Sequence, residues 1–271
     1  MSSEEELNSV LTIKTLQISP FKTLIAALKE ILVETNIEFT PEGMKILDMD
    51  KSHTIVVRLF LPADRFEFYN CKKDRILIGV NMLIFFKFLS VLENSDTLTL
   101  YIPNEEFSDG IVTKLMMNFE NESKGVKIIK GMKLIDPDPE AMTYPDIEFQ
   151  SVINMSSAEL QKNVKYLAMI TDKIEIKSVG NEVIFSGKGE LGTSEARYRE
   201  CDGNLRFLKK QNSAKVVQGE FSLKNLGYFI KCTNLCPYIE MYLENDIPLI
   251  IKYDVASMGE IKFCLSPLPS T

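Results

Sequence analysis

Few residues in this 271-residue chain have the types and spacing that catalysis requires. His53 is the only histidine, so a histidine-dependent triad or metal site would rest on a single side chain. Gly187-Lys188-Gly189 lacks the spacing and the following Ser or Thr of a nucleotide-binding loop. Carboxylates are numerous, but nothing in the sequence selects a general acid/base pair among them. We therefore expect no enzyme activity and no cofactor.

The five cysteines are scattered and odd in number, which favours free thiols in a reducing compartment. Cys232 and Cys236 are four residues apart, but a zinc site needs four ligands, and no matching Cys/His pair is nearby. We expect no metal site. Residues 1–10 begin with an acidic stretch that lacks the features of a signal peptide, and we interpret them as a disordered tail. No apolar run reaches membrane-spanning length, so we expect no membrane partner.

The charge distribution is uneven. The chain has 31 basic and 38 acidic residues, a net charge of −7, which by itself argues against a nucleic-acid partner. Four segments with a 3.6-residue apolar period, 19–34, 82–93, 156–170 and 222–236, nevertheless contain seven lysines against four acids. The four segments therefore have a net charge of +3, and since the whole chain has −7, the rest of the chain has a net charge of −10. These lysines are Lys22, Lys29, Lys87, Lys162, Lys165, Lys224 and Lys231.

The spacing of the lysines places them together on the predicted helices. Lys22/Lys29 and Lys224/Lys231 are seven residues apart, so each pair lies on one helix face off the apolar stripe. On one helix alone, lysines that merely keep the polar face soluble would explain this pattern. Four helices that agree within an acidic chain favour a basic surface for phosphates, with no element that reads bases.

An internal repeat accounts for the four helices. Residues 11–60 predict strand, helix, strand, turn, strand, and residues 147–186 repeat that order. The first helices begin near Ser19 and Ser156, 137 residues apart, and the second ones near Asn81 and Ser222, 141 apart. We predict two homologous α+β domains, at 11–133 and 147–271, each with two helices on antiparallel sheets. A proline-rich linker at 134–146 would join them.

Short segments in fixed order carry a family resemblance that covers about residues 11–267. The matching segments are Leu47-Asp48-Met49-Asp50-Lys51-Ser52-His53, Gly79-Val80-Asn81, Ser186-Gly187-Lys188-Gly189-Glu190-Leu191-Gly192, Pro248-Leu249-Ile250-Ile251-Lys252-Tyr253, Met258-Gly259 and Leu265-Ser266-Pro267. Together they resemble the eukaryotic-type sliding clamp family, proliferating cell nuclear antigen (PCNA), and a viral or divergent eukaryotic origin fits equally.

The resemblance implies the DNA-clamp fold, a homotrimeric ring whose helices line a hole for duplex DNA. It implies a processivity factor that tethers DNA polymerase and other proteins bearing clamp-binding peptides, requires an ATP-driven clamp loader, and works in the nucleus or at a viral replication site. The family's channel positions fall on Lys14, Lys22, Lys29, Lys87, Lys162, Lys165, Lys224 and Lys231. Two further lysine positions of the family fall on Thr23 and Ser90.

The resemblance also implies two protein-binding surfaces. Ring closure would pair edge strands at about 124–134 and 191–198, with interface residues Val126, Ile128, Lys130, Gly192, Ser194 and Ala196. Partner peptides would bind Met49, Thr54, Met142, Tyr144, Pro145, Pro248, Cys264, Ser266 and Pro267. This chain departs from the family at three positions: it has Cys264, Ser266 and Leu268 where the family has a tyrosine, an alanine and a lysine.

Two alternatives remain from the residues alone. One is a checkpoint-type clamp subunit, which shares the fold but acts in a heterotrimer. The other is a DNA-modifying enzyme with an unrecognised site. The oligomeric state in solution would separate the first from a homotrimeric clamp, and a nuclease assay with metal would test the second.

Overall fold

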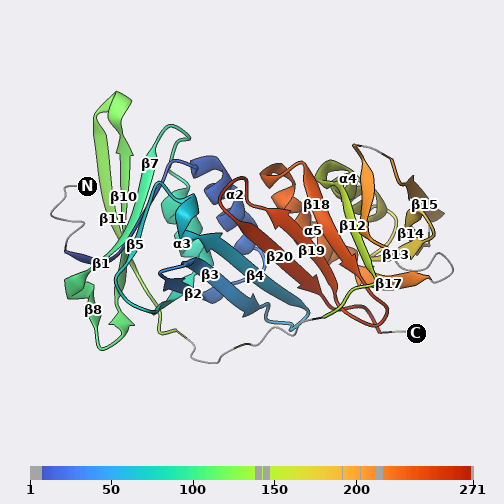
Figure 1. Ribbon diagram of the computed structural model, residues 1–271, viewed down its shortest axis with the longest axis horizontal. Coiled ribbons are helices and arrows are strands. Elements are labelled where there is room, and N and C mark those ends of the chain that lie inside the picture. Colours follow the sequence, from blue (N-terminus) through green and yellow to red (C-terminus); the bar gives the residue numbers. More distant parts are fainter. Residues whose placement is uncertain are drawn as a thin grey trace. The chain divides into compact units, whose positions relative to one another are not determined.

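The computed structural model describes residues 8–137, 142, 147–190, 192–201, 203–210 and 216–269. The chain folds into two compact units. The first draws its described residues from 1–48, 58–142 and 255–260, and the second from 49–57, 143–254 and 261–271. Each unit combines α-helices with antiparallel β-strands (Figure 1). The prediction of an α+β fold is confirmed.

The segment up to residue 133 alternates strands with two helices. Its elements are β1 (Ser9–Thr15), α2 (Ile18–Leu28), β2 (Glu34–Thr40), β3 (Gly43–Met49), β4 (Ile55–Pro62), β5 (Phe68–Cys71), β6 (Ile76–Asn81), α3 (Met82–Leu89), β7 (Thr97–Pro103), β8 (Phe107–Ser108), β9 (Ile111–Val112), β10 (Lys114–Asn121) and β11 (Val126–Lys133). Short 3-10 turns are η1 (Ala63–Arg65), η2 (Asn104–Glu106) and η3 (Glu122–Lys124).

The segment from residue 151 repeats this order. Its elements are β12 (Ser151–Ser156), α4 (Ser157–Leu167), β13 (Lys173–Val179), β14 (Glu182–Gly189), β15 (Gly192–Arg199), β16 (Leu205–Lys209), β17 (Val217–Ser222), α5 (Leu223–Phe229), η4 (Ile230–Leu235), β18 (Tyr238–Leu243), β19 (Leu249–Asp254) and β20 (Glu260–Leu265). The starts of α2 and α4 are 139 residues apart, and those of α3 and α5 are 141 apart. The observed helices therefore follow the predicted repeat.

Two sheets end in strands that have one free edge. In the first unit the strand order is β11-β10-β7-β1-β5, so among the described residues β11 pairs only with β10, from Lys114↔Lys133 to Asn121↔Val126. In the second unit the order is β15-β14-β13-β17, and within the part of the chain that the structure describes β15 pairs only with β14. Further strands run β3-β2-β6 in one part of the chain and β16-β12-β18-β19-β20 in another.

The helices pack in pairs through apolar faces. In the first unit α2 buries Phe21 and Leu24 and lies beside α3, where Phe21 meets Phe85 edge-on at 6.3 Å between ring centroids. In the second unit α4 packs against α5 and η4 and buries Leu160 and Val164. Each such large apolar side chain contributes about 1.5–3 kcal/mol when it leaves water. The helix faces that remain outside carry the lysines.

Several element boundaries differ from the sequence-based expectations. Strand β1 begins at Ser9, inside the expected tail of residues 1–10. Leu134 and Ile135 lie in the expected linker but still donate backbone hydrogen bonds to Thr113 and Gly79, so the ordered fold extends past residue 133. No helix in the described ranges is long and apolar enough to cross a membrane.

The helix starts lie close to the expected ones. The second helices begin just after Asn81 and Ser222, whose side chains cap α3 and α5. The first helix begins slightly earlier than Ser19: Gln17 is the N-cap of α2, and Ser19 and Pro20 lie inside its first turn. The first N–H groups of a helix have no intrahelical acceptor, so a proline fits anywhere in the first turn. Pro20 is therefore compatible with a helix that begins at Ile18 and with one that begins after Ser19, and the sequence cannot distinguish the two.

Candidate nucleic-acid interface and docking region

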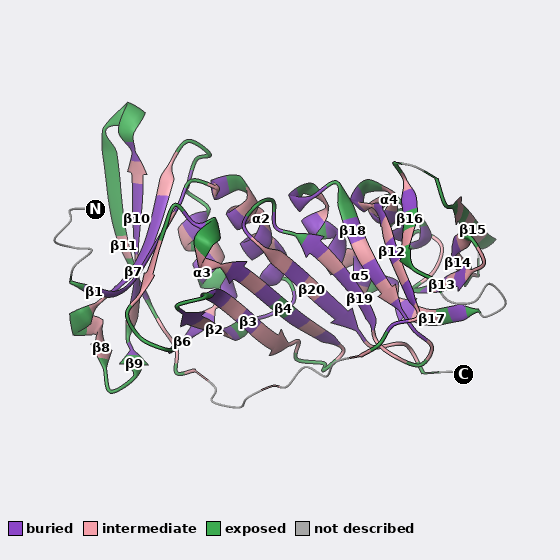
Figure 2. Ribbon diagram, viewed as in Figure 1, coloured by how far each residue is buried: buried purple, intermediate pink, exposed green. Residues whose placement is uncertain are grey.

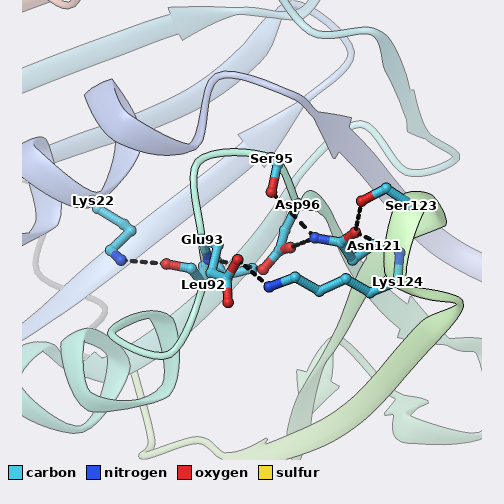
Figure 3. Close-up of polar contacts among 8 residues, drawn as sticks. All are labelled: Lys22, Leu92, Glu93, Ser95, Asp96, Asn121, Ser123 and Lys124. Atoms are coloured by element: carbon cyan, nitrogen blue, oxygen red, sulfur yellow. Dashed lines mark hydrogen bonds and ion pairs between the residues drawn. The ribbon is translucent and has the colours of Figure 1, made fainter.

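Lys22 on α2 is bound to the end of α3. Its Nζ donates a hydrogen bond to the carbonyl oxygen of Leu92 at 2.5 Å (Figure 3). It also donates to the carbonyl oxygen of Ser90 at 3.3 Å. These carbonyls follow the last turn of α3, where backbone oxygens lack helical partners and a positive charge is favoured. Lys22 therefore stabilises the α3 terminus.

The loop after α3 is held from the opposite side as well. Lys124 lies 2.5 Å from a carboxylate oxygen of Glu93, and this contact raises the pKa of the lysine. The side-chain amide of Asn121 donates to Asp96 at 2.6 Å and to Ser95 at 3.2 Å (Figure 3). The loop thus has a fixed shape set by α2, η3 and the end of β10.

The other lysines of the first unit have different surroundings. Lys29 pairs with Glu30 at 2.6 Å, lies 4.8 Å from the ring centroid of Phe86, and has only 19% of its side chain exposed. Lys87 on α3 is exposed. Lys14 lies on strand β1, opposite residues of β5 and β7, so it does not belong to the helix-borne set.

The helices of the second unit present their lysines outward. Lys162 is 74% exposed and lies 3.8 Å from Glu159, whose carboxylate accepts a 2.9 Å hydrogen bond from the hydroxyl of Tyr198. Lys165 and Lys224 are exposed, and neither side chain has a hydrogen bond or ion pair within the described part of the chain. Lys231 is exposed on η4.

The loop that follows β3 is organised by one carboxylate. Asp50 accepts hydrogen bonds from the backbone N–H groups of Ile55 at 2.6 Å, Thr54 at 2.8 Å and Ser52 at 3.2 Å, and also from the Ser52 hydroxyl. Partial burial raises the pKa of this carboxyl, but these hydrogen bonds outweigh it and lower the pKa below its ordinary value. His53, at the tip of the turn, is exposed with φ of 57°.

Thr54 joins this turn to the rest of the second unit. Its carbonyl oxygen accepts a 3.0 Å hydrogen bond from the backbone of Ser266, and its hydroxyl accepts one at 3.3 Å from the side chain of Asn225 on α5. Two of the predicted partner-binding residues, Thr54 and Ser266, are thereby brought together. We call Met49, Thr54, Pro248, Cys264, Ser266 and Pro267, all in the second unit, the docking region.

A small apolar cluster lies at the docking region. Cys264 packs with Phe149 and Ile250, and the three are 5–7% exposed. Tyr242 meets Phe149 edge-on at 5.6 Å between ring centroids. Met142 belongs to the first unit, and Tyr144 and Pro145 lie outside the described residues. The structure therefore gathers six of the nine predicted docking residues within one unit.

The two predicted interface strands are both free sheet edges. Strand β11 is exposed along most of its length (Figure 2), with Val126 44% and Ile128 42% exposed. The ammonium of Lys130 lies over the rings of Phe88 and Phe119. Gly192, Ser194 and Ala196 lie on β15, which alternates between exposed and half-buried residues. Each edge can accept a further strand.

Comparison with known proteins gives this arrangement a family. The family models of the proliferating cell nuclear antigen N-terminal and C-terminal domains match residues 10–141 and 143–268. The chain belongs to the PCNA family. This confirms the resemblance carried by the short sequence segments, and with it the α+β clamp fold.

Two viral relatives support the assignment. The chain is 33% identical over 266 residues to a probable DNA polymerase sliding clamp 1 of Paramecium bursaria Chlorella virus 1, with 97% of this chain and 98% of that protein covered. It is 30% identical over 226 residues to a probable DNA polymerase sliding clamp of Acanthamoeba polyphaga mimivirus. That match covers 83% of this chain, which spans about half (47%) of the mimivirus protein's length.

Several residues of this PCNA-family chain escaped the sequence reasoning. Asp50 and Asn225, which fix Thr54, and Phe149, which supports Cys264, were not predicted as part of the docking region. Asp50 was open to prediction, because an Asp that precedes Ser and Thr often accepts hydrogen bonds from backbone N–H groups that follow it. Asn225 and Phe149 are 171 and 115 residues from Thr54 and Cys264, so no local pattern links them.

Remaining chemistry-bearing residues of the chain have ordinary structural surroundings. Cys232 is buried, and burial strongly raises the pKa of its thiol. Cys236 donates a 3.0 Å hydrogen bond to the backbone carbonyl of Tyr238. Among the residues that the structure describes, no group of three or more His, Cys, Asp or Glu side chains is placed to hold a metal ion.

Proposed function

We propose that this protein is a DNA sliding clamp, a polymerase processivity factor that encircles duplex DNA and has no catalytic activity of its own. The observation that carries the proposal is the match of both PCNA domains along nearly the whole chain. The names of the viral relatives, probable DNA polymerase sliding clamps, point to the same function.

The ring would be a homotrimer closed through its free sheet edges. Strand β11 of one subunit would pair with β15 of the next, in a head-to-tail contact that closes by rotation. Unpaired N–H and C=O groups on both edges supply the hydrogen bonds, and the exposed Val126 and Ile128 supply apolar area. Exposed apolar residues on α3, Leu83 at 48% and Ile84 at 44%, lie on a helix that contacts β11 and would extend this surface.

The mechanism we propose is topological. A closed ring cannot leave a continuous duplex, so strong contacts with DNA are unnecessary and would impede sliding. Lysines on the helices, in a chain with a net charge of −7, would make weak phosphate contacts that carry no sequence information. The acidic remainder of the surface would not attract DNA to the outside of the ring.

Partners would bind at the docking region. A peptide with an apolar or aromatic anchor would contact the surface at Cys264, Pro248 and Pro267 beside the Asp50 turn. DNA polymerase and an ATP-driven clamp loader are the partners we propose, at a nuclear or viral replication site. We also propose the division into a domain at 11–133, a linker at 134–146 and a domain at 147–271; the family matches, at 10–141 and 143–268, meet within that linker.

The oligomeric state tests the proposal. Light scattering on the pure protein should give about 92 kDa, three times the 30.8 kDa of one chain. A persistent monomer that assembles only with other chains would favour the checkpoint-type heterotrimer instead. A nuclease assay with Mg²⁺ should be negative, and turnover that depends on a carboxylate of this chain would refute the non-catalytic reading.

A further inference from the structure

The two helix pairs carry similar numbers of lysines, but these lysines are engaged differently. In the first unit, Lys22 and Lys29 are bound to neighbouring groups of the same unit. In the second unit, Lys165 and Lys224 are exposed. We propose that α4, α5 and η4 form the main phosphate-binding surface for duplex DNA, while Lys22 and Lys29 serve chiefly to hold the first unit together. The inference rests on the proposed function.

Lys22 is held in place by hydrogen bonds to the loop after α3. Its ammonium donates to two carbonyl oxygens just beyond α3, those of Ser90 and Leu92, and it is the group from α2 that satisfies them. The loop that carries Leu92 is fixed independently through Glu93 and Lys124, so it cannot follow Lys22 toward a phosphate. To bind DNA, Lys22 would have to give up both hydrogen bonds and leave the helix terminus without its cation.

Lys29 is held in place by an ion pair and by packing against an aromatic ring. Its ammonium lies 2.6 Å from Glu30 and 4.8 Å from the ring centroid of Phe86, with 19% of the side chain exposed. A phosphate approaching it would meet the Glu30 carboxylate at the same place. Lys87 is the lysine of this helix pair that stays open to solvent.

The lysines of the second unit are more exposed, although Lys162 also has an acidic neighbour, Glu159 at 3.8 Å. Lys162 has 74% of its side chain exposed, against 19% for Lys29. The one acid on α4, Glu159, accepts a hydrogen bond from the hydroxyl of Tyr198, which directs part of its charge toward β15. Gln161 donates to the carbonyl of Ile230, so α4 and η4 are fixed to each other and present their lysines on one body. An anion would relieve the repulsion among these positive charges.

Matched double variants test the inference on the full-length protein. Lys165→Gln with Lys224→Gln and Lys22→Gln with Lys29→Gln remove the same charge, and glutamine at position 22 can still donate a hydrogen bond to the carbonyls of the α3 loop. Binding of a short fluorescent duplex is measured by anisotropy over a series of low salt concentrations. The logarithm of affinity falls with the logarithm of salt by about 0.9 per phosphate contact, so the first pair should lower that slope by up to about 1.8.

We expect the second pair to leave the slope within error of wild type while lowering the melting temperature. Equal slope losses in the two variants, or a larger loss for the Lys22/Lys29 pair, would overturn the inference and leave the clamp proposal standing. If the slope stays at its wild-type value in both double variants, the inference and the assignment of the helices to DNA are both overturned. A wild-type protein that shows no salt-dependent binding of the short duplex would overturn the inference, whereas failure of a clamp loader to retain the protein on circular DNA would refute the proposed function itself.

A second measurement needs no variants. Trace acetylation of the free protein, read by mass spectrometry, should modify Lys165 and Lys224 fastest and Lys22 and Lys29 slowly, since the last two are engaged. Excess duplex should slow the acetylation of Lys165 and Lys224 and leave the rates at Lys22 and Lys29 unchanged. Protection of Lys22 or Lys29 by DNA to the same extent would contradict the proposed division of roles.

Discussion

Removal of the Asp50 carboxylate should disorganise the docking region. Asp50 accepts backbone hydrogen bonds from Ile55 at 2.6 Å and Thr54 at 2.8 Å, and Thr54 in turn binds Ser266 and Asn225. A hydrogen bond to a charged group contributes about 1.5–3 kcal/mol, and the lower end applies to a half-exposed turn. Asp50→Ala should therefore cost about 3 kcal/mol, and Asp50→Asn, which keeps an acceptor oxygen, about 1 kcal/mol.

The cost can appear in either of two measurements. If the turn stays formed in the variant, the loss lowers the free energy of unfolding, measured by chemical denaturation. If the turn frays, folding is spared and the loss appears in the affinity for a fluorescent clamp-binding peptide. About 3 kcal/mol corresponds to roughly 100-fold in affinity. Asp64→Ala is a suitable control, since its side chain is 79% exposed and its nearest cation is Arg65 at 3.8 Å.

The way in which the stability contribution of Asp50 changes with pH tests the same prediction. The pKa of Asp50 is lowered in the folded protein, so its contribution to stability is complete above the ordinary carboxyl pKa of about 3.9 and is lost as pH falls through the lowered value. The difference in unfolding free energy between wild type and Asp50→Asn should shrink over that acid range. Unchanged stability and unchanged peptide affinity in Asp50→Ala would refute the role assigned to the turn.

Three further substitutions probe other parts of the structure. Ile128→Glu on the free edge β11 should convert the trimer to monomers in light scattering, whereas Ile111→Glu, at a 60% exposed position on β9, should leave the trimer intact. Gly189→Ala should destabilise the protein by about 1–3 kcal/mol, because its Cβ would overlap the carbonyl oxygen of Ile170; an unchanged melting temperature would contradict this. Phe149→Ala should cost about 3–5 kcal/mol of stability through the cavity it leaves, and a loss below 1 kcal/mol would show that the cluster at the docking region is loosely packed.

The repeated helices and the family could be predicted from the sequence, because amphipathic periodicity and ordered short segments are local signals. The helix ends were less predictable. The segment 222–236 predicts one helix, yet α5 ends at Phe229 and continues as the 3-10 segment η4. Pro237 contributes to the end of η4 at Leu235, because a proline disfavours helical geometry in the residue before it, and Cys236 is extended. Short strands such as β5, β8 and β9 lack a clear alternation and were not predicted.

The state of each lysine was beyond the reach of sequence reasoning. Spacing places Lys22 and Lys29 on one face of α2, equivalent in pattern to Lys224 and Lys231. Glu30, next to Lys29, is a local partner, but the loop after α3 and Phe86 are about 60 to 70 residues away, and only the fold brings these groups together. Periodicity gives the face of a helix, and tertiary structure decides whether the charge on that face is available.

The central claim, a closed ring around DNA, is tested most directly by retention on circular and linear duplexes. The protein, placed on a nicked plasmid with a eukaryotic-type clamp loader and ATP, should co-elute with the plasmid in gel filtration at moderate salt. Cutting the plasmid once should release it, because the ring slides off the new ends. Equal retention before and after the cut would mean that the protein holds DNA by direct contact, and would contradict the account.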